Sequence, residues 1–173
     1  MLKNYTEIYK DGTYLNNNPT WDAEDSEFKA NKILQLLNKH NIPLDSICEV
    51  GCGSGEILVQ LSSHLPSNTK FLGFDISADA INIAKKKETT QIKFELKDIT
   101  DVSLNQPFDL VLIMDVIEHV ENYFDFLRAL TTKSRYKSFI SLLICVPGLS
   151  FVKKCSLNQK KESDIYMYLR KTS

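Results

Sequence analysis

Three glycines that follow a short apolar segment constrain this chain more than any other feature. The segment Ile47–Val50 runs directly into Gly51, Gly53 and Gly55. Glycine has no Cβ, so its backbone can turn tightly and can approach a ligand closely. From Glu56 onward, apolar residues recur at helical spacing: Ile57, Leu58, Leu61 and Leu65. The order of strand, glycine turn and helix predicts a small-molecule site, and a tight turn without a ligand is the structural alternative.

The residue after the last glycine narrows the class of ligand. The dinucleotide fingerprint G-x-G-x-x-G needs a small residue where this chain has Glu56. A carboxylate at the start of a helix would also repel the pyrophosphate that a helix dipole attracts. The sequence therefore predicts a ligand without phosphate groups and disfavours a nicotinamide oxidoreductase.

The segment from Glu49 to Gly55 resembles the first motif of the class I S-adenosylmethionine-dependent methyltransferases. The resemblance implies an α/β fold, with a Rossmann-like, doubly wound and mostly parallel sheet. It also implies S-adenosyl-L-methionine as the cofactor, a positively charged sulfonium without phosphates. The loop residues that would lie under its methionine part are Glu49, Gly51, Cys52, Gly53 and Gly55.

A second apolar run, residues 71–77, ends near Asp75, twenty residues beyond the last glycine. An acidic residue at the tip of a second strand can accept two hydrogen bonds from a ribose diol. Ser77 is a candidate N-cap for a helix over 78–87, which would leave Asp75 free for the ribose. We therefore expect Asp75, with Ile76 beside it, in the cofactor site; a capping role for Asp75 is the alternative.

A third run, Ile92–Ile99, alternates apolar and polar residues and ends at Asp98. It resembles the third motif of the same family. The resemblance implies that the Asp98 carboxylate and the backbone N–H of Ile99 read the edge of the adenine. Alternatively, Asp98 only opens a loop.

A fourth run, Leu110–Met114, is continuously apolar, as expected for a parallel strand covered on both faces. Asp115 then stands at the carboxyl end, where open α/β sheets bind ligands. In similar methyltransferases an Asp-x-x-Glu-His sequence lies beside the transferable methyl group and the substrate pocket. This implies a catalytic role and a cofactor contact for Asp115, and an acceptor contact for Glu118. A histidine side chain can take a proton near neutral pH, so His119 is our hypothesis for a general base. Alternatively, Glu118 and His119 only lead into a helix. A general base is not required in that case, because methyl transfer can proceed by proximity and orientation alone. We expect that helix at 121–131, with Tyr123, Phe124, Leu127 and Leu130 on its buried side.

The segment before the first strand is a candidate lid. Residues 14–22 are polar and rich in turn formers, and residues 23–40 have the spacing of a helix. In similar methyltransferases the residues before the first strand close over the cofactor and the acceptor, which makes Tyr14 and Trp21 candidates. Alternatively, Trp21 anchors the loop to the core.

The 173 residues suit one domain. We expect a methyltransferase domain at 1–150, with the lid and helix at 1–40, and a basic tail at 151–173. Residues 138–146 and 165–169 have strand patterns. A complete class I domain needs two further strands after the fifth, so we expect a truncated or altered C-terminal part that lacks the last strands.

The composition indicates which binding partners and which cellular compartment to expect. From residue 151 onward six basic and two acidic residues give a charge of +4, which suits a solvated tail better than a nucleic-acid site. The four cysteines lack metal-ligand spacing, so no metal is expected: Cys48, Cys52, Cys145 and Cys155. We find no secretion leader and no membrane segment, so we expect a cytoplasmic protein with reduced thiols.

Two functions from different classes follow. In the first, the chain is an active methyltransferase that methylates a nucleophile on a small-molecule acceptor. In the second, it binds S-adenosylmethionine without turnover, as an incomplete or regulatory domain. Enzymes with this fold act on many acceptors, so the fold by itself defines neither the acceptor nor the oligomeric state.

Overall fold

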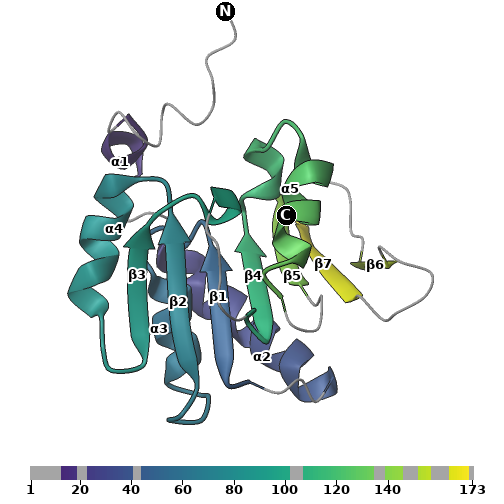
Figure 1. Ribbon diagram of the computed structural model, residues 1–173, viewed down its shortest axis with the longest axis horizontal. Coiled ribbons are helices and arrows are strands. Elements are labelled where there is room, and N and C mark those ends of the chain that lie inside the picture. The colour runs from purple at the N-terminus through teal and green to yellow at the C-terminus, as the bar shows by residue number, and fades with distance from the viewer. Residues whose placement is uncertain are drawn as a thin grey trace, which may run out of the picture.

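A seven-stranded sheet organises the protein, with the strand order β3-β2-β1-β4-β5-β7-β6 (Figure 1). The computed structural model describes residues 13–18, 23–40, 44–101, 107–134, 139–145, 152–156 and 164–171. The strands are β1 (Ser46–Val50), β2 (Lys70–Asp75), β3 (Ile92–Leu96), β4 (Leu110–Met114), β5 (Phe139–Cys145), β6 (Val152–Ser156) and β7 (Asp164–Lys171). Strands β1 to β5 pair in parallel. The expected mostly parallel α/β sheet is confirmed.

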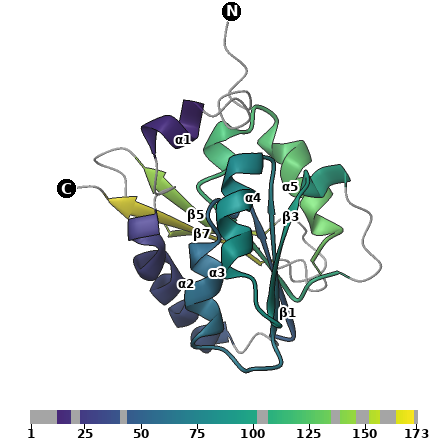
Figure 2. The same cartoon turned by 90° about the vertical axis from the view of Figure 1, so that its left-hand side faces the viewer.

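Helices flank the sheet on both sides. They are α1 (Thr13–Asn17), α2 (Ser26–His40), α3 (Glu56–Ser62), α4 (Ala78–Ala84) and α5 (Tyr123–Thr131). Short 3-10 turns are η1 (Ala23–Asp25), η2 (Lys85–Lys87), η3 (Ile99–Asp101) and η4 (Ile117–His119). Figure 2 shows α2, α3 and α4 on one side and α5 on the other. The sheet is therefore doubly wound, as the sequence predicts.

Alternating side chains of the strands build two cores. Ile47 of β1 packs in the core under α2, α3 and α4. Its neighbour Cys48 packs in the opposite core under α5, together with Leu127 and Leu130. Because successive side chains of a strand point to opposite faces, one apolar strand supplies both cores. All five residues of β4 are buried, which explains its unbroken apolar sequence.

The carboxyl-terminal part corrects one expectation. We expected the last strands of the fold to be missing, but β6 and β7 extend the sheet beyond β5. Strand β7 pairs in parallel with β5, and β6 pairs antiparallel with β7 at the edge. The strand pattern at 165–169 is confirmed by β7, whereas β6 was not expected in the segment predicted to be a basic tail.

Helix α5 corrects a second expectation, because only part of its predicted apolar face is buried. Leu127 and Leu130 lie in the core, but Tyr123 and Phe124 are 42% and 60% exposed. These two rings contact each other, with 4.3 Å between their centroids. The half-buried Phe126 packs against the core in their place, so the buried stripe is narrower and shifted along the helix.

Candidate cofactor site

The glycine loop folds over the carboxyl end of β2. The backbone N–H groups of Gly51 and Cys52 donate to the carbonyl oxygen of Phe74 at 2.8 and 3.0 Å. Gly51, Gly53 and Gly55 have φ angles of 70°, 53° and 77°, in the left-handed region. Glycine adopts this region without the steric cost that a side chain brings. The three glycines predicted as a turn therefore form one.

Two of these glycines also make room for neighbouring side chains. A Cβ added to Gly55 would lie 2.4 Å from Cζ of Phe94, on β3. A Cβ added to Gly51 would lie 2.3 Å from Cγ2 of Val116, which follows β4. Gly55 is buried against the ring of Phe94, so its role is packing, whereas Gly51 lines the pocket described below.

Asp75 ends β2 and holds the glycine loop. Its Oδ2 accepts a hydrogen bond from the N–H of Gly53, and its Oδ1 accepts one from the N–H of Ser77, both at 2.8 Å. Ser77 caps α4 as predicted, because its hydroxyl accepts from the N–H of Ala80. We expected Asp75 to be free, but both of its carboxylate oxygens accept hydrogen bonds from the backbone. A carboxylate oxygen can accept more than one hydrogen bond, so Asp75 retains acceptor capacity for a diol.

A pocket of about 530 Å³ opens at the carboxyl ends of the strands. Six predicted site residues line it: Gly51, Asp75, Ile76, Asp98, Ile99 and His119. An apolar wall that the sequence analysis missed completes it: Val116, Val120, Phe126 and Ala129. The residues come from separate strand ends, as the topology of an open parallel sheet requires.

Asp98 has a local role as well as a place at the pocket. Its Oδ1 accepts from the backbone N–H and the hydroxyl of Thr100, at 2.9 and 2.7 Å. These bonds close the turn that starts η3, where Ile99 is buried. The loop-opening alternative is thus observed, and Asp98 still lines the pocket.

Beside the pocket, a lysine from α2 meets acidic groups of the sheet. Nζ of Lys29 lies 2.6 Å from Oδ2 of Asp115, and the Lys29 side chain is 7% exposed. Asp115 has a φ of 51°, the one positive φ outside glycine among the described residues. Such strained backbone often marks functional sites. Lys29 was not among the site residues predicted from the sequence.

Two carboxylate oxygens in this cluster lack a hydrogen-bond partner among the residues that the structure describes. They are Oε2 of Glu49 and Oδ1 of Asp115, and both are buried. Burial raises the pKa of Glu49 well above its usual value, and the charges of Asp75 and Asp115 raise it further while Lys29 lowers it. Burial also raises the pKa of Asp75, against the hydrogen bonds from backbone N–H groups. Buried polar atoms normally have partners, so these oxygens fit a cationic ligand such as the amino-acid end of the predicted cofactor.

Because its folded pKa is raised, Glu49 makes stability depend on pH. Above the usual value of 4.5, the folded chain keeps a proton that the unfolded chain releases, so the free energy of unfolding falls as pH rises. Glu49→Gln cannot titrate. We expect the stability of this variant relative to the parent to rise as pH increases above 4.5, the usual pKa of Glu49, by at most about 1.4 kcal/mol per pH unit. Urea unfolding of both proteins across this range checks it, and parallel pH profiles would contradict it.

Other predicted residues lie apart from the pocket or outside the description. Cys52 is buried, with its Sγ 3.9 Å from the carbonyl oxygen of Gly53. Tyr14 is half-buried in α1, which lies at the end of the sheet where the arrowheads of β1 to β4 point (Figure 1). Trp21 lies outside the described residues. Glu118 belongs to η4, and its side chain is not among those described.

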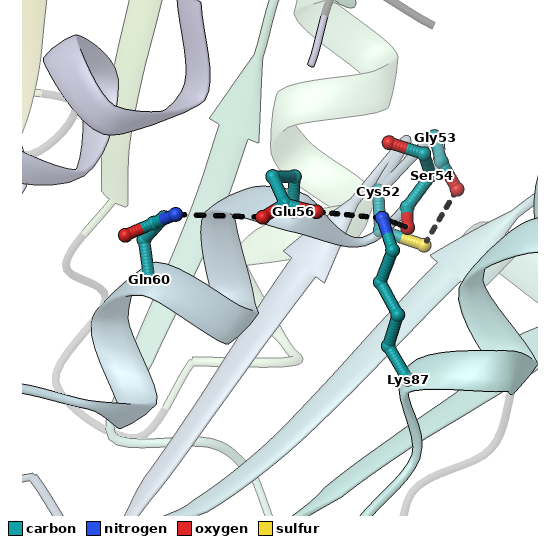
Figure 3. A network of polar contacts seen from close by, with 6 residues as sticks. All are labelled: Cys52, Gly53, Ser54, Glu56, Gln60 and Lys87. Atoms are coloured by element: carbon teal, nitrogen blue, oxygen red, sulfur yellow. Dashed lines mark hydrogen bonds and ion pairs between the residues drawn. The ribbon is translucent and has the colours of Figure 1, made fainter. Parts of the chain in front are cut away.

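Glu56 does not act as the sequence analysis expected. Its Oε2 lies 2.6 Å from Nζ of Lys87, and its Oε1 accepts from Nε2 of Gln60 (Figure 3). Glu56 is not among the pocket residues. A carboxylate neutralised by Lys87 does not repel a phosphate in the pocket, so the exclusion of phosphate ligands does not follow from Glu56.

Three further properties of the described residues bear on the predictions. No group of three or more histidine, cysteine or acidic residues among them could hold a metal ion. Within the same residues, no helix has the length and apolar character needed to cross a bilayer. Cys48 and Cys52 are free thiols, and burial raises the pKa of both.

Comparison with known proteins agrees with this geometry. A family profile described as a methyltransferase domain matches residues 43–168. The chain therefore belongs to the class I S-adenosylmethionine-dependent methyltransferases, and S-adenosylmethionine is the cofactor of that family.

Individual relatives differ in what they methylate. Human EEF1A lysine methyltransferase 2 is 26% identical over 147 residues, which cover 82% of this chain and 59% of that protein. The mitochondrial ubiquinone biosynthesis O-methyltransferase of Candida albicans is 32% identical over 104 residues, which cover 57% of this chain and 30% of that protein. The chain thus spans 59% or less of the length of these curated relatives.

A solved structure shares the fold. Magnesium protoporphyrin IX methyltransferase from Synechocystis, with S-adenosylmethionine bound, superposes with a TM-score of 0.58 at 19% identity. The match covers 78% of this chain and 74% of that one. At this identity the likeness shows the architecture, and the acceptor must be argued separately.

Proposed function

We propose that this chain binds S-adenosylmethionine and transfers its methyl group to a nucleophile on a small-molecule acceptor. One observation carries the cofactor part: two buried carboxylate oxygens without partners, on Glu49 and Asp115, lie in one charged cluster with Lys29. The amino-acid end of the cofactor bears one ammonium and one carboxylate. The unpartnered oxygens suit the ammonium, and Lys29 suits the carboxylate.

The lined pocket suits the adenosyl part. Asp75 has remaining acceptor capacity for the ribose diol. Asp98 and Ile99 line the same pocket and would read the adenine edge. Val116, beside them, offers an apolar surface to a planar ring. The bound cofactor supplies an electrophilic methyl group on a positively charged sulfur.

The chain's residues position the acceptor and manage its proton. In the proposed transfer the acceptor's O, N or C atom would form a bond to the methyl group as the bond from sulfur to methyl breaks. The bonding electron pair would stay on sulfur, which would leave S-adenosylhomocysteine with a neutral sulfur. His119 is exposed at the pocket, where its imidazole can take the acceptor's proton. The proposed lid, with Tyr14 and Trp21, would exclude water, and Glu118 would contact the acceptor.

A small molecule is favoured as the acceptor by charge. The net charge of the whole chain is −1, and the described residues that line the pocket include more acidic than basic side chains. A nucleic acid would instead require clustered lysine and arginine residues. The ubiquinone biosynthesis O-methyltransferase among the relatives has a small-molecule acceptor by its name, which supports the same choice here, whereas the relative named as a lysine methyltransferase has a protein acceptor.

Turnover with methyl-labelled S-adenosylmethionine and a cell extract tests the proposal. We expect label in the low-molecular-weight fraction, and His119→Ala should lower turnover by about tenfold or more near pH 7. Label in protein would refute the small-molecule acceptor. Cofactor binding without any labelled product would favour the domain without turnover. A turnover profile of His119→Ala that matches the parent across pH would remove the base role.

A further inference from the structure

The glycine loop has a second anchor, which comes from the far end of α4. Nζ of Lys87, in η2, lies 3.0 Å from the carbonyl oxygen of Ser54 and 2.6 Å from Oε2 of Glu56 (Figure 3). Gln60 donates to the other oxygen of the same carboxylate at 3.4 Å. One ammonium group therefore binds both the loop and the first turn of α3.

The two anchors fix two peptide groups of the same loop, Cys52–Gly53 and Ser54–Gly55. Asp75 accepts from the N–H of Gly53 at 2.8 Å, whereas Lys87 donates to the carbonyl of Ser54. Asp75 immediately precedes the turn into α4, and Lys87 follows α4. Both ends of a single helical segment thus hold the loop, and a helix keeps the distance between its ends nearly constant.

The surroundings make the Lys87 contact more than a surface ion pair. Ser54 is 4% exposed, and Gly55 next to it is buried against the ring of Phe94. The side chains of Lys87 and Glu56 are 29% and 25% exposed, so solvent screens them only in part. Gly55 is the N-cap residue of α3 and supplies no side-chain hydrogen bond, so the first turn depends on external partners.

We propose that Lys87 is a positioning residue that fixes the peptide between Ser54 and Gly55 and so keeps the glycine loop in the shape that the cofactor requires. Lys87 is not among the pocket residues and acts through the loop. The proposal rests on the cofactor-binding function above. Its first consequence, a rigid loop, concerns the cofactor-free protein and can be measured alone.

Hydrogen–deuterium exchange of the full cofactor-free chain tests the rigid loop. The N–H groups of Gly53 and Gly55 donate to Asp75 and to the carbonyl of Cys52, so their exchange reports on the loop. Lys87→Met should speed exchange of a peptide covering 51–56 by roughly three- to tenfold, and Lys87→Arg by much less. Lys93→Met is the matched control. Lys93 also forms a lysine–glutamate ion pair, in which its Nζ lies 3.2 Å from Oε2 of Glu88, but this pair does not involve the loop.

The second measurement is affinity for S-adenosylmethionine by calorimetry. Lys87→Met should bind roughly three- to tenfold more weakly, and Lys93→Met within about twofold of the parent. Glu56→Gln leaves the contact between Lys87 and Ser54 in place, so this variant should lose less affinity than Lys87→Met. Unchanged loop exchange in Lys87→Met overturns the proposal, as does faster exchange with unchanged affinity. A parent chain that binds no cofactor refutes the proposed function instead, and loop exchange then decides the role of Lys87.

Discussion

Replacing Gly55 with alanine should lower the free energy of unfolding by about 2 to 4 kcal/mol. Two costs add. The φ of 77° strains any residue with a Cβ, and the new Cβ would lie 2.4 and 2.5 Å from two ring atoms of Phe94. Phe94 is itself 2% exposed, so its ring has little room to move. Urea unfolding, followed by far-ultraviolet circular dichroism, measures the loss.

Gly73→Ala separates the two costs. A Cβ at Gly73 would meet the Phe94 ring at 2.6 Å and the Cys52 side chain at 2.8 and 2.9 Å, but Gly73 lacks a positive φ. We expect this control to lose about 1 to 3 kcal/mol through overpacking alone, without the backbone strain of Gly55→Ala. A double variant of Gly55→Ala with Phe94→Leu should lose less than the sum of the two single variants. Strict additivity would show that the ring is not what excludes a side chain.

The largest expected effect on ligand binding is that of Lys29→Met. Affinity for S-adenosylhomocysteine should fall by roughly thirtyfold or more, because the variant loses the one cation that reaches Asp115 at 2.6 Å among the described residues. Without it, the carboxylates of Asp115 and Glu49 would face the carboxylate of the ligand. Calorimetry with the purified chain provides the measurement.

A truncated ligand distinguishes recognition from damage. 5′-Methylthioadenosine lacks the amino-acid end, so its affinity should change much less in Lys29→Met than that of S-adenosylhomocysteine. Lys39→Met, an exposed position on the same helix, is the control and should bind both ligands as the parent does. An equal loss of affinity for both ligands would show that Lys29 maintains the fold and does not recognise the amino-acid end of the ligand.

Periodicity predicted the elements that carry the pocket. The apolar spacing at Ile57, Leu58 and Leu61 marked α3, and all three side chains are buried. The continuous apolar run of β4 was predicted with the bounds that the structure gives, Leu110–Met114. These segments have strong local patterns, since each must bury one stripe or both faces. The acidic residues at the strand ends followed from the same patterns.

Charged residues with distant partners were less predictable. Glu56 pairs with Lys87, 31 positions away, and no local pattern indicates that pair. Lys29 could have been found. It lies four and eight positions before Ile33 and Leu37, on the buried stripe of α2, where a cation needs a partner. Tyr123 and Phe124 matched helical spacing, but they lie in the first turn of α5, where their side chains stay exposed.

The shared carbonyl of Phe74 limits how the chain can vary. One oxygen at the end of β2 receives the N–H groups of both Gly51 and Cys52. An inserted residue between β1 and Gly53 would separate these donors from a carbonyl whose place is set by another strand. Loop length here is therefore dictated by the neighbouring strand, so natural insertions and engineered peptide tags belong elsewhere on the molecule.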